Sequence, residues 1–327
     1  MNVRDACQVR SIDRLAATTP LLVPSFSSRG FPDVADIHAL TKEYLVDVSL
    51  VSAYDLQHGS LPESEIYTTD LLFLDSGGYE AGVAVDPLEP YADDRHGLAW
   101  TPNEYDCVLR RLQPLADVVI VNFDYGDPQS LADQERQART LFDAHPAFAG
   151  DFLCKPASTG ARFIDVDELI DQVDTLALFA LIGVTEKELG PSLLDRCRNL
   201  IRIRGALSAR GHETPIHVFG SLDPATVLAY FLCGADVFDG LAWLRFAFRE
   251  GAPIYHIAAI VADGAWSARD EDLVMLHRVQ NLTWLKDQQR VMRAFCCGHM
   301  LADLEDVRAL IRQVVPLVQA AGLTIEE

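Results

Sequence analysis

Short apolar runs recur along the chain, and most of them are followed by a segment with helical periodicity. Runs of this length that end in Gly, Pro, Asp or Ser are typical of buried strands. The eight runs are Thr18–Ser25, Tyr44–Ala53, Leu71–Ser76, Val118–Asp124, Asp151–Lys155, Ala177–Gly183, Pro215–Gly220 and Ala235–Gly240. The helical segments are Pro102–Leu115, Leu131–Ala144, Val166–Leu176, Leu193–Arg210, Ala225–Cys233, Glu271–Phe295 and Leu301–Ala321.

This alternation of strands and helices favours an α/β fold with a parallel sheet that helices cover. Eight strands predict a single (β/α)8 TIM barrel over about residues 15–260, with additional C-terminal helices over about residues 270–322. An open doubly wound sheet is the alternative, but no Gly-x-Gly-x-x-Gly motif follows any of the runs. Because no repeat or linker divides the chain, we expect one domain over residues 1–327.

The most informative stretch, residues 215–249, has the pattern of a strand, a helix and a second strand. Ser221 or Asp223 can cap the helix, and Pro224 suits its first turn. Asp239 then stands at the end of the second strand, where parallel barrels place their chemistry. A buried carboxylate is costly without a partner or a role, so we expect a function for Asp239. The alternative is a structural acid that caps a loop.

Composition describes an ordinary soluble globular protein, with 49% hydrophobic and 23% charged residues among 327. The formal net charge of −21 argues against wrapping a long duplex through non-specific attraction to its phosphates. It leaves room for a local basic patch, because the field beside a site matters more than the total charge.

The chain has no window with the roughly 18 uninterrupted apolar residues that a membrane helix needs. Residues 1–13 are charged, so we expect no signal peptide and no membrane association. The seven cysteines are odd in number and several lie in apolar patterns, which is typical of reduced thiols. We therefore expect a cytoplasmic protein.

Acids and glycines gather at the ends of the apolar runs. Because all βα loops of a barrel open on the same side, these residues should meet on one face. Three carboxylates there suit a nucleophile, a general acid/base and an acceptor for a ligand. Magnesium binding is the rival interpretation, but no His accompanies the acids at metal spacing. The set is Asp75, Ser76, Gly77, Gly78, Tyr79, Asp124, Lys155, Gly183, Gly220 and Asp239.

These residues resemble the motifs of the tRNA-guanine transglycosylases, and the resemblance covers most of the chain. The most specific motif is Asp75-Ser76-Gly77-Gly78-Tyr79. Residues 19–24 resemble the first strand of the family, and Phe123-Asp124 resembles the segment after the fourth strand. Val237-Phe238-Asp239 resembles the strand that carries the nucleophile, and Asn281-Leu282 the segment after the zinc insertion.

The resemblance implies a pentosyltransferase that exchanges guanine in a nucleic acid for a free 7-deazaguanine base without ATP. Asp239 would attack the ribose C1′, expel guanine and leave a covalent glycosyl-enzyme. Asp75 would be the general acid/base for the departing and entering bases.

Base and phosphate recognition follow from the same resemblance. Asp124 would accept from the guanine N1–H and exocyclic amine, and Tyr79 would stack on the base. Arg245 and Arg249 would contact phosphate. The base-binding set would be Ser76, Gly77, Gly78, Tyr79, Asp124, Lys155, Gly183 and Gly220.

The sequence departs from the family at the zinc site, which needs Cys-x-Cys-x2-Cys and a following His. No cysteine lies between Cys233 and Cys296, and the His position holds Gln280. We therefore expect no zinc, no other metal and no cofactor. Cys296, Cys297 and His299 are too close in sequence to form a tetrahedral site alone, so we expect core or helix-end roles for them.

A second departure concerns the base. Lys155 stands where the family has the Gln that reads the base's carbonyl, and Glu80 stands where it has another Gln. Together with the missing zinc, this favours the branch that inserts 7-deazaguanines into DNA over tRNA modification. Two alternatives stay open, a silent nucleic-acid-binding or scaffold subunit and a base-releasing nucleoside hydrolase. The family often dimerises through its zinc-bearing region, so a homodimer and a complex with a partner protein stay open too.

Overall fold

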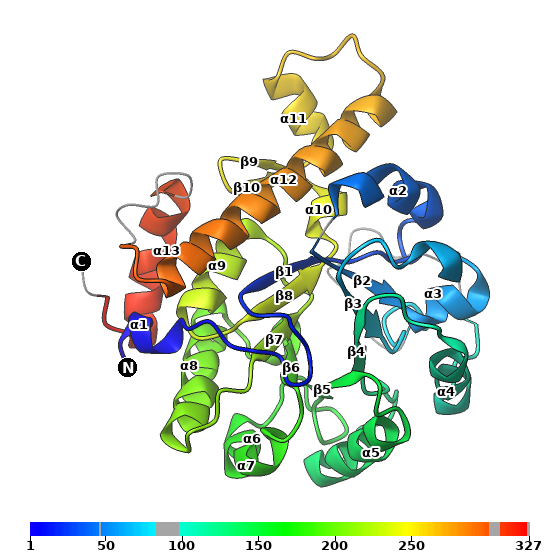
Figure 1. Cartoon of the computed structure of the whole chain (residues 1–327). Coiled ribbons are helices and arrows are strands. Elements are labelled where there is room, and N and C mark those ends of the chain that lie inside the picture. Colours follow the sequence, from blue (N-terminus) through cyan, green and yellow to red (C-terminus); the bar gives the residue numbers. More distant parts are fainter. Residues whose placement is uncertain (46, 83–97, 301–307, 326–327) are drawn as a thin grey trace.

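The computed structural model of the chain describes residues 1–45, 47–82, 98–300 and 308–325 (Figure 1). Its centre is an eight-stranded parallel sheet in which strands consecutive in the chain, from β2 to β8, are neighbours and β8 pairs with β1. The strands are β1 (Leu21–Pro24), β2 (Val48–Ser52), β3 (Leu71–Asp75), β4 (Asp117–Val121), β5 (Ala149–Cys154), β6 (Leu181–Thr185), β7 (Ile216–Phe219) and β8 (Val237–Gly240).

The seam between β1 and β2 is nearly closed. Ser25 forms a parallel bridge with Leu50, and the Phe26 N–H donates to the Leu50 carbonyl at 2.9 Å. On the same edge of β1, the Gln289 side chain accepts from the Leu22 N–H at 2.7 Å. The sheet therefore curls into a TIM-barrel-like α/β fold, which confirms the predicted fold class.

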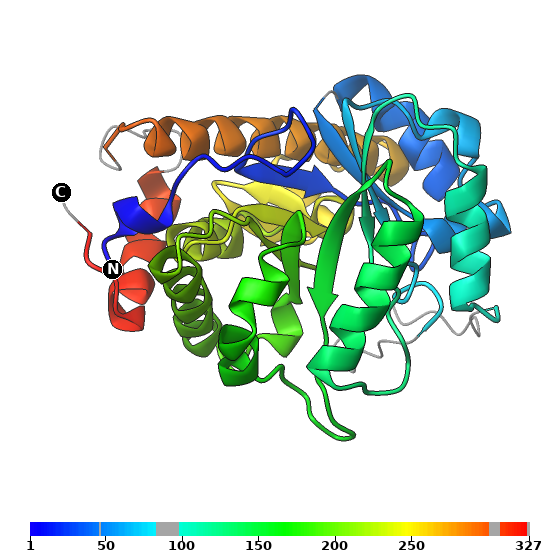
Figure 2. The same cartoon turned by 60° about the horizontal axis from the view of Figure 1, so that its bottom comes forward.

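Helices cover the outside of the barrel (Figure 2). The α-helices of this layer are α2 (Val34–Thr41), α3 (Ala53–His58), α4 (Pro102–Arg111), α5 (Leu131–Ala144), α6 (Val166–Asp171), α7 (Val173–Leu176), α8 (Leu193–Ala209) and α9 (Pro224–Leu232). Short 3-10 turns stand at η1 (Lys42–Tyr44), η2 (Glu63–Glu65) and η3 (Glu186–Glu188). Side-chain caps mark several starts: Asp223 accepts from the N–H groups of Ala225 and Thr226 at the start of α9.

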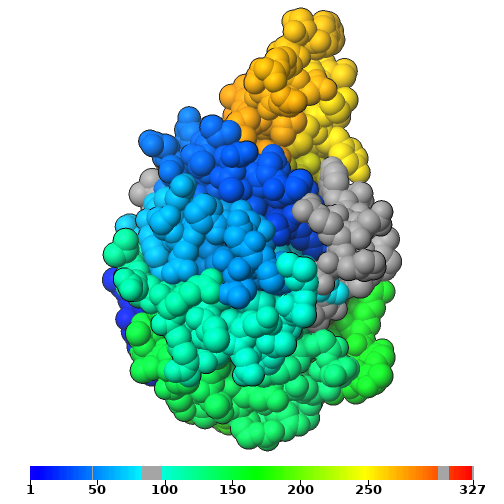
Figure 3. Space-filling model, turned by 90° about the vertical axis from the view of Figure 1, so that its right-hand side faces the viewer, coloured from blue at the N-terminus to red at the C-terminus, as the bar shows by residue number. Residues whose placement is uncertain are grey.

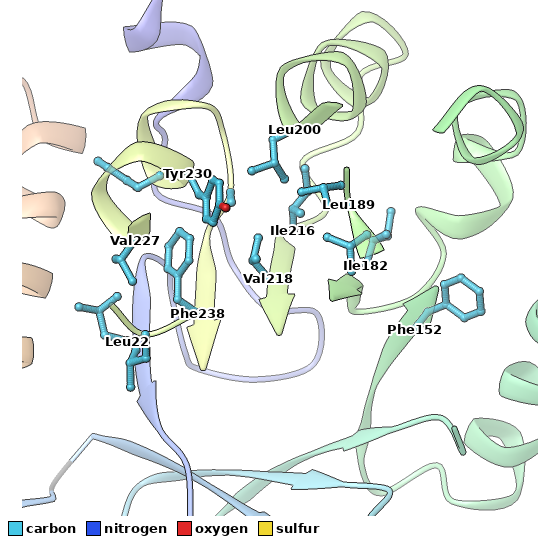
Figure 4. Packing of buried hydrophobic residues seen from close by; sticks show 14 of the residues in the cluster. Leu22, Phe152, Ile182, Leu189, Leu200, Ile216, Val218, Val227, Tyr230 and Phe238 are labelled. Carbon is cyan, nitrogen blue, oxygen red and sulfur yellow. The ribbon is translucent and has the colours of Figure 1, made fainter. Parts of the chain in front are cut away.

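Alternation along each strand separates two packed layers. On β8, Val237 belongs to the cluster that fills the barrel, whereas Phe238 belongs to the cluster between the strands and the helices. Figure 4 shows the outer cluster, with Phe238, Val218 and Ile182 facing helical side chains such as those of Tyr230 and Leu200. The inner face of β8 therefore carries Asp239, two positions beyond Val237, toward the barrel axis.

The C-terminal part begins with α10 (Ala242–Arg245), the hairpin of β9 (Ala247–Arg249) and β10 (Ala252–Ile254), and α11 (His256–Ala262). The long helix α12 (Asp270–Cys296) crosses the barrel at β1, and its first half projects with α11 as an arm (Figures 1 and 3). The last helix, α13 (Arg308–Ala321), packs against α8 and α9. It lies beside α1 (Val3–Ala6), where the Val3 N–H donates to the Thr324 carbonyl at 3.0 Å.

Several sequence predictions differ from these boundaries. The strand predicted over Ala177–Gly183 begins too early, because residues 177–180 form the turn that ends α7 and β6 starts at Leu181. Val166–Leu176 forms two short helices, α6 and α7, and Tyr44 lies in η1 ahead of β2. For the predicted helix Leu301–Ala321, residues 301–307 lie outside the described residues and the remainder is α13.

Candidate functional site

The C-terminal ends of the strands place the predicted acids at one mouth of the barrel. Asp75 is the last residue of β3, Asp239 lies next to the last residue of β8, and Asp124 follows β4. The charges of Asp239 and Asp124 both act on the Asp75 carboxyl, which shows that the three side chains converge. The fold thus brings together the three carboxylates that the sequence analysis singled out.

The Asp239 carboxylate is held by three groups. Ser25 donates its hydroxyl to Asp239 Oδ2 at 2.8 Å, and the Gly220 N–H donates to Oδ1 at 3.0 Å. His217 Nε2 lies 3.3 Å from the same Oδ1. Gly220 has φ of 77°, the left-handed conformation that glycine adopts without strain, and this turn accompanies the hydrogen bond from its N–H to the carboxylate. These contacts fix the orientation of the Asp239 carboxylate.

Asp75 has a different environment. The Gly77 N–H donates to Asp75 Oδ2 at 2.9 Å. Burial, followed by the charge of Glu80 and then those of Asp239 and Asp124, raises the pKa of Asp75 to about 7. A carboxyl group with a pKa near the working pH can both give and take a proton. This is the property that a general acid/base needs.

A second pair of acids lies behind Asp75. Burial and the charge of Asp55 raise the pKa of Glu80 to about 7, and burial also raises the pKa of Asp55 to about 6. Ser27 donates its hydroxyl to Glu80, and the Ser28 N–H donates to Asp55 at 2.8 Å. Glu80 was noted in the sequence only as a departure from the family, and Asp55 was missed because it lies in the unpredicted helix α3.

The glycines of the Asp75 motif are required by the protein's own packing. A Cβ at Gly78 would lie 2.7 Å from the Cβ of Asp124, and one at Gly77 would lie 2.5 Å from the Cβ of Tyr54. Ser76 accepts from the Asp124 N–H at 3.2 Å through its hydroxyl. The packing of the protein alone therefore explains these glycines, and the motif positions Asp124 against β3.

Tyr79 and Arg245, predicted separately as a base contact and a phosphate contact, are joined by a hydrogen bond. Arg245 Nη2 donates to the Tyr79 hydroxyl at 2.8 Å. The guanidinium carbon of Arg29 lies 4.5 Å from the centre of the Tyr79 ring. Arg249 lies on β9 and pairs with Asp263 at 2.6 Å. Arg29 and Arg245 are thus two cations beside Tyr79, and the sequence analysis missed the first.

Lys155 lies between two acids in a cavity of about 220 Å³ beside the mouth. Its Nζ is 2.8 Å from Glu188 Oε1 and 3.3 Å from Asp124 Oδ2. Burial lowers the pKa of Lys155, but the charges of Asp124 and Glu188 outweigh it and raise that pKa. Among the described residues, Asp124 Oδ1 and Glu188 Oε2 are buried without a hydrogen-bond partner. Phe123 also lines the cavity, so it offers an apolar wall and two acceptors.

Gly183, a predicted base contact, does not lie at the strand end where the sequence placed it. It lies in the middle of β6 and not at its end. A Cβ there would lie 2.5 Å from the Phe219 ring and 3.0 Å from Asp151 Oδ1. Gly183 therefore makes room inside the barrel for side chains of β5 and β7.

One of those side chains belongs to a pair that the sequence analysis missed. His217 Nδ1 lies 2.6 Å from Asp151 Oδ2, and both residues are fully buried in the barrel. In the sequence, His217 and Asp151 each lie in an apolar run that predicts only a buried strand. Strand alternation places Asp151 inward with Ala149 and Leu153, so the inward polar positions were the available signal.

The cysteines among the described residues are all free thiols. Cys296 ends α12, Cys297 caps it, and the His299 N–H donates to the Ala294 carbonyl at 3.1 Å. In the described parts of the chain, no three His, Cys, Asp or Glu side chains are arranged to hold a metal ion. The predicted lack of zinc stays a prediction.

Comparison with known proteins assigns no family or function to the chain. No protein-family model matches the chain, and no curated protein sequence matches it. No helix in the described ranges is long and apolar enough to cross a membrane. The chemistry must therefore be argued from the barrel and its mouth.

Proposed function

We propose that this protein is a transglycosylase that exchanges guanine in a nucleic acid for a 7-deazaguanine. The observation that carries the proposal is the contrast between Asp239 and Asp75 at one mouth. Asp239 accepts from the Ser25 hydroxyl and the Gly220 N–H and lies 3.3 Å from His217 Nε2, whereas burial and neighbouring acids raise the pKa of Asp75 to about 7. Two carboxyls whose environments differ in this way divide the roles of nucleophile and acid/base.

The reaction then has two displacements, as in retaining glycosidases. In the first, an Asp239 oxygen forms a bond to C1′ while the C1′–N9 bond breaks, and the proton of Asp75 goes to the departing guanine. In the second, Asp75 takes the proton from N9 of the 7-deazaguanine, N9 bonds to C1′, and the ester to Asp239 breaks. Both carboxyl groups end as they began, so no cofactor is consumed.

The cavity beside the mouth supports a purine-like base as the ligand. Asp124 Oδ1 and Glu188 Oε2 are buried acceptors without partners, and a guanine edge presents N1–H and amine donors. Phe123 in the cavity wall and Tyr79 near the mouth supply aromatic surface for a flat ring. A base in a stack cannot reach such a cavity, so the target nucleotide would have to leave its helix.

The substrate we favour is DNA, and the protein would act in the cytoplasm without a metal. The absent zinc ligands and Lys155 in place of the family's Gln support this choice over tRNA. Arg245 and Arg249 are the proposed phosphate contacts. A homodimer or a partner protein would bind elsewhere on the surface.

Mass spectrometry of base incorporation tests the proposal. The protein is incubated with labelled 7-deazaguanines and with guanine-containing DNA, tRNA or free nucleosides, and the digested products are analysed. We expect incorporation into DNA with one guanine released per base inserted, and none from Asp239→Asn. Asp117→Asn is the matched control, because Asp117 is an exposed residue at the opposite end of β4.

Three other outcomes contradict the proposal or its substrate. Guanine release without incorporation indicates a hydrolase. Binding without either product indicates a silent subunit. Incorporation into tRNA alone keeps the reaction and replaces the substrate.

A further inference from the structure

A histidine ring lies between two carboxylates beneath the mouth. His217 Nδ1 is 2.6 Å from Asp151 Oδ2, and Nε2 is 3.3 Å from Asp239 Oδ1. The three residues come from β7, β5 and β8, and all point into the barrel. His217 and Asp151 are both 0% exposed. The chain Asp151–His217–Asp239 therefore runs from the interior to the proposed nucleophile.

When both acids are ionised, the hydrogen-bonding groups of the ring favour its charged form. A neutral imidazole has one N–H donor and one acceptor nitrogen. If its proton were on Nδ1, the lone pair of Nε2 would face the Asp239 carboxylate, and the reverse tautomer would set Nδ1 against Asp151. Only the imidazolium offers a donor to each carboxylate. Two acids and one cation also leave this buried group with a net charge of −1 and not −2.

The ring is held in place by its neighbours. Phe219 stacks on it with ring centres 3.8 Å apart, and Phe73 meets it edge-on at 5.4 Å. Gly183 has no side chain where a Cβ would press on Phe219 and on Asp151. These contacts leave His217 no room to turn away from Asp239, and they keep the ring away from solvent.

We infer that His217 is a positioning residue for Asp239: held by Asp151, its imidazolium lies beside the Asp239 carboxylate and orients it among the acids of the mouth. This inference deepens the proposed function and rests on it for the role of Asp239 as nucleophile. In the first displacement the cation holds the attacking carboxylate in one orientation. In the second it stabilises the carboxylate that leaves C1′.

Electrostatics support the geometry. Burial by itself lowers the pKa of His217, but the charge and hydrogen bond of Asp151, and then those of Asp239, raise it to about 9. Within the described chain, the charged groups that face the ring are Asp151 from β5 and Asp239 from β8, while β3 and β7 present Phe73 and Phe219. The charge of Asp239 also acts on Asp75, because the two acids repel each other at the mouth.

Nitrogen NMR of the full chain with labelled histidines tests the inference without any substrate. The signal of His217 is identified by its loss in His217→Gln, and its protonation is followed from pH 5 to pH 10. We expect both ring nitrogens of wild type to carry protons at pH 7.5, with one proton lost near pH 9. Asp151→Asn should move that loss down most, Asp239→Asn less because of the longer distance, and Asp117→Asn not at all.

Two results overturn the inference. One is a neutral His217 at pH 7.5 in wild type, which needs no variant to fold. The other is a titration that Asp239→Asn leaves unchanged, because coupled groups must affect each other equally.

The pH profile of adduct formation supplies the link to catalysis. In Asp151→Asn, we expect His217 to lose its proton at lower pH, so adduct formation should decline on the alkaline side at a lower pH than in wild type. An unchanged profile would contradict the positioning role. If wild type forms no adduct with any nucleic acid, the proposed function fails, while the NMR result still decides the charge and coupling of His217.

Discussion

Asp236, just before β8, and Asp239, within β8, show how the two ends of one barrel differ. Asp236, at the closed end, accepts from Arg10 Nη1 at 2.7 Å and from Arg204, and it also accepts from the Ile216 N–H at 2.8 Å. Asp239, at the mouth, accepts from the Ser25 hydroxyl and the Gly220 N–H, lies 3.3 Å from His217 Nε2, and faces Asp75.

The comparison distinguishes an acid that is buried to stabilise the fold from acids that are buried where they can react. At the closed end, two guanidinium groups surround one carboxylate, and Arg204 and Asp236 are almost wholly buried. At the mouth, burial and neighbouring acids raise the pKa values of Asp75, Glu80 and Asp55. An excess of buried acid destabilises the fold, so its presence at a mouth indicates chemistry.

The largest effect should follow from Asp236→Asn. It leaves Arg10 and Arg204 without their shared anion, and breaking a buried ion pair costs about 3–5 kcal/mol. Urea unfolding monitored by circular dichroism should show this loss, with a much smaller loss for Asp239→Asn. Equal losses for the two variants would remove the distinction between the two ends.

The next effect concerns pH. Because the folded pKa of Asp75 is raised from 3.8 to about 7, its contribution to stability is fully present below about pH 4 and is lost as the pH rises through 7. Asp75→Asn should remove this loss and be more stable than wild type at pH 8, by on the order of 1–3 kcal/mol. Unfolding measured between pH 4 and pH 8 checks it.

Asp106→Asn is the opposite control for that experiment. The hydrogen bond from Arg110 lowers the pKa of Asp106, so its contribution is present at neutral pH and is lost on acidification. The two variants should therefore change the pH dependence with opposite signs. If both variants changed the pH dependence of stability in the same direction, the neighbouring acids would not raise the pKa of Asp75.

Gly78→Ala tests whether the mouth is tightly built. The new methyl group would lie 2.7 Å from the Cβ of Asp124, and overpacking of this kind costs about 1–3 kcal/mol. Calorimetry should show weaker binding of a free 7-deazaguanine because Asp124 is displaced. Gly205→Ala in α8 is the control, since a Cβ there meets no atom within 4 Å. Unchanged binding by Gly78→Ala would separate Asp124 from the base site.

The sequence predicts the frame of this molecule well, because barrel strands repeat a simple pattern of apolar runs. It predicts Asp75, Asp124 and Asp239, because each closes a run and the ends of parallel strands must meet. It does not reveal Asp151 and His217, because a polar residue within a run reads as part of a buried strand. Their pairing depends on the register of three strands, which no local pattern contains.

The predicted ends of strands and helices are wrong where packing, and not the spacing of apolar residues, decides where an element begins. Ala177–Ala180 is apolar, and only its turn from α7 shows that β6 begins at Leu181. The partners of the predicted arginines were also beyond reach. Arg249 pairs with Asp263 across the base of the arm, and Arg245 meets Tyr79 from a distant part of the chain.

The smallest effects should come from these arginines. Arg245→Gln should weaken nucleic-acid binding and reduce its salt slope by roughly one unit. Arg249→Gln should change the slope less, because Asp263 already shares its charge. Affinity measured by fluorescence anisotropy over a range of salt concentrations compares them. An unchanged slope for both would place phosphate contacts elsewhere.

The most direct measurement of the central claim is the mass of the protein after reaction with labelled guanine-containing nucleic acid and denaturation. Wild type should carry a covalent adduct that peptide mapping places on Asp239. Asp239→Asn should carry none, Asp75→Asn should form it more slowly, and Asp117→Asn should match wild type. A full yield of adduct in Asp239→Asn, or no adduct in wild type with DNA, tRNA or nucleosides, would contradict the account.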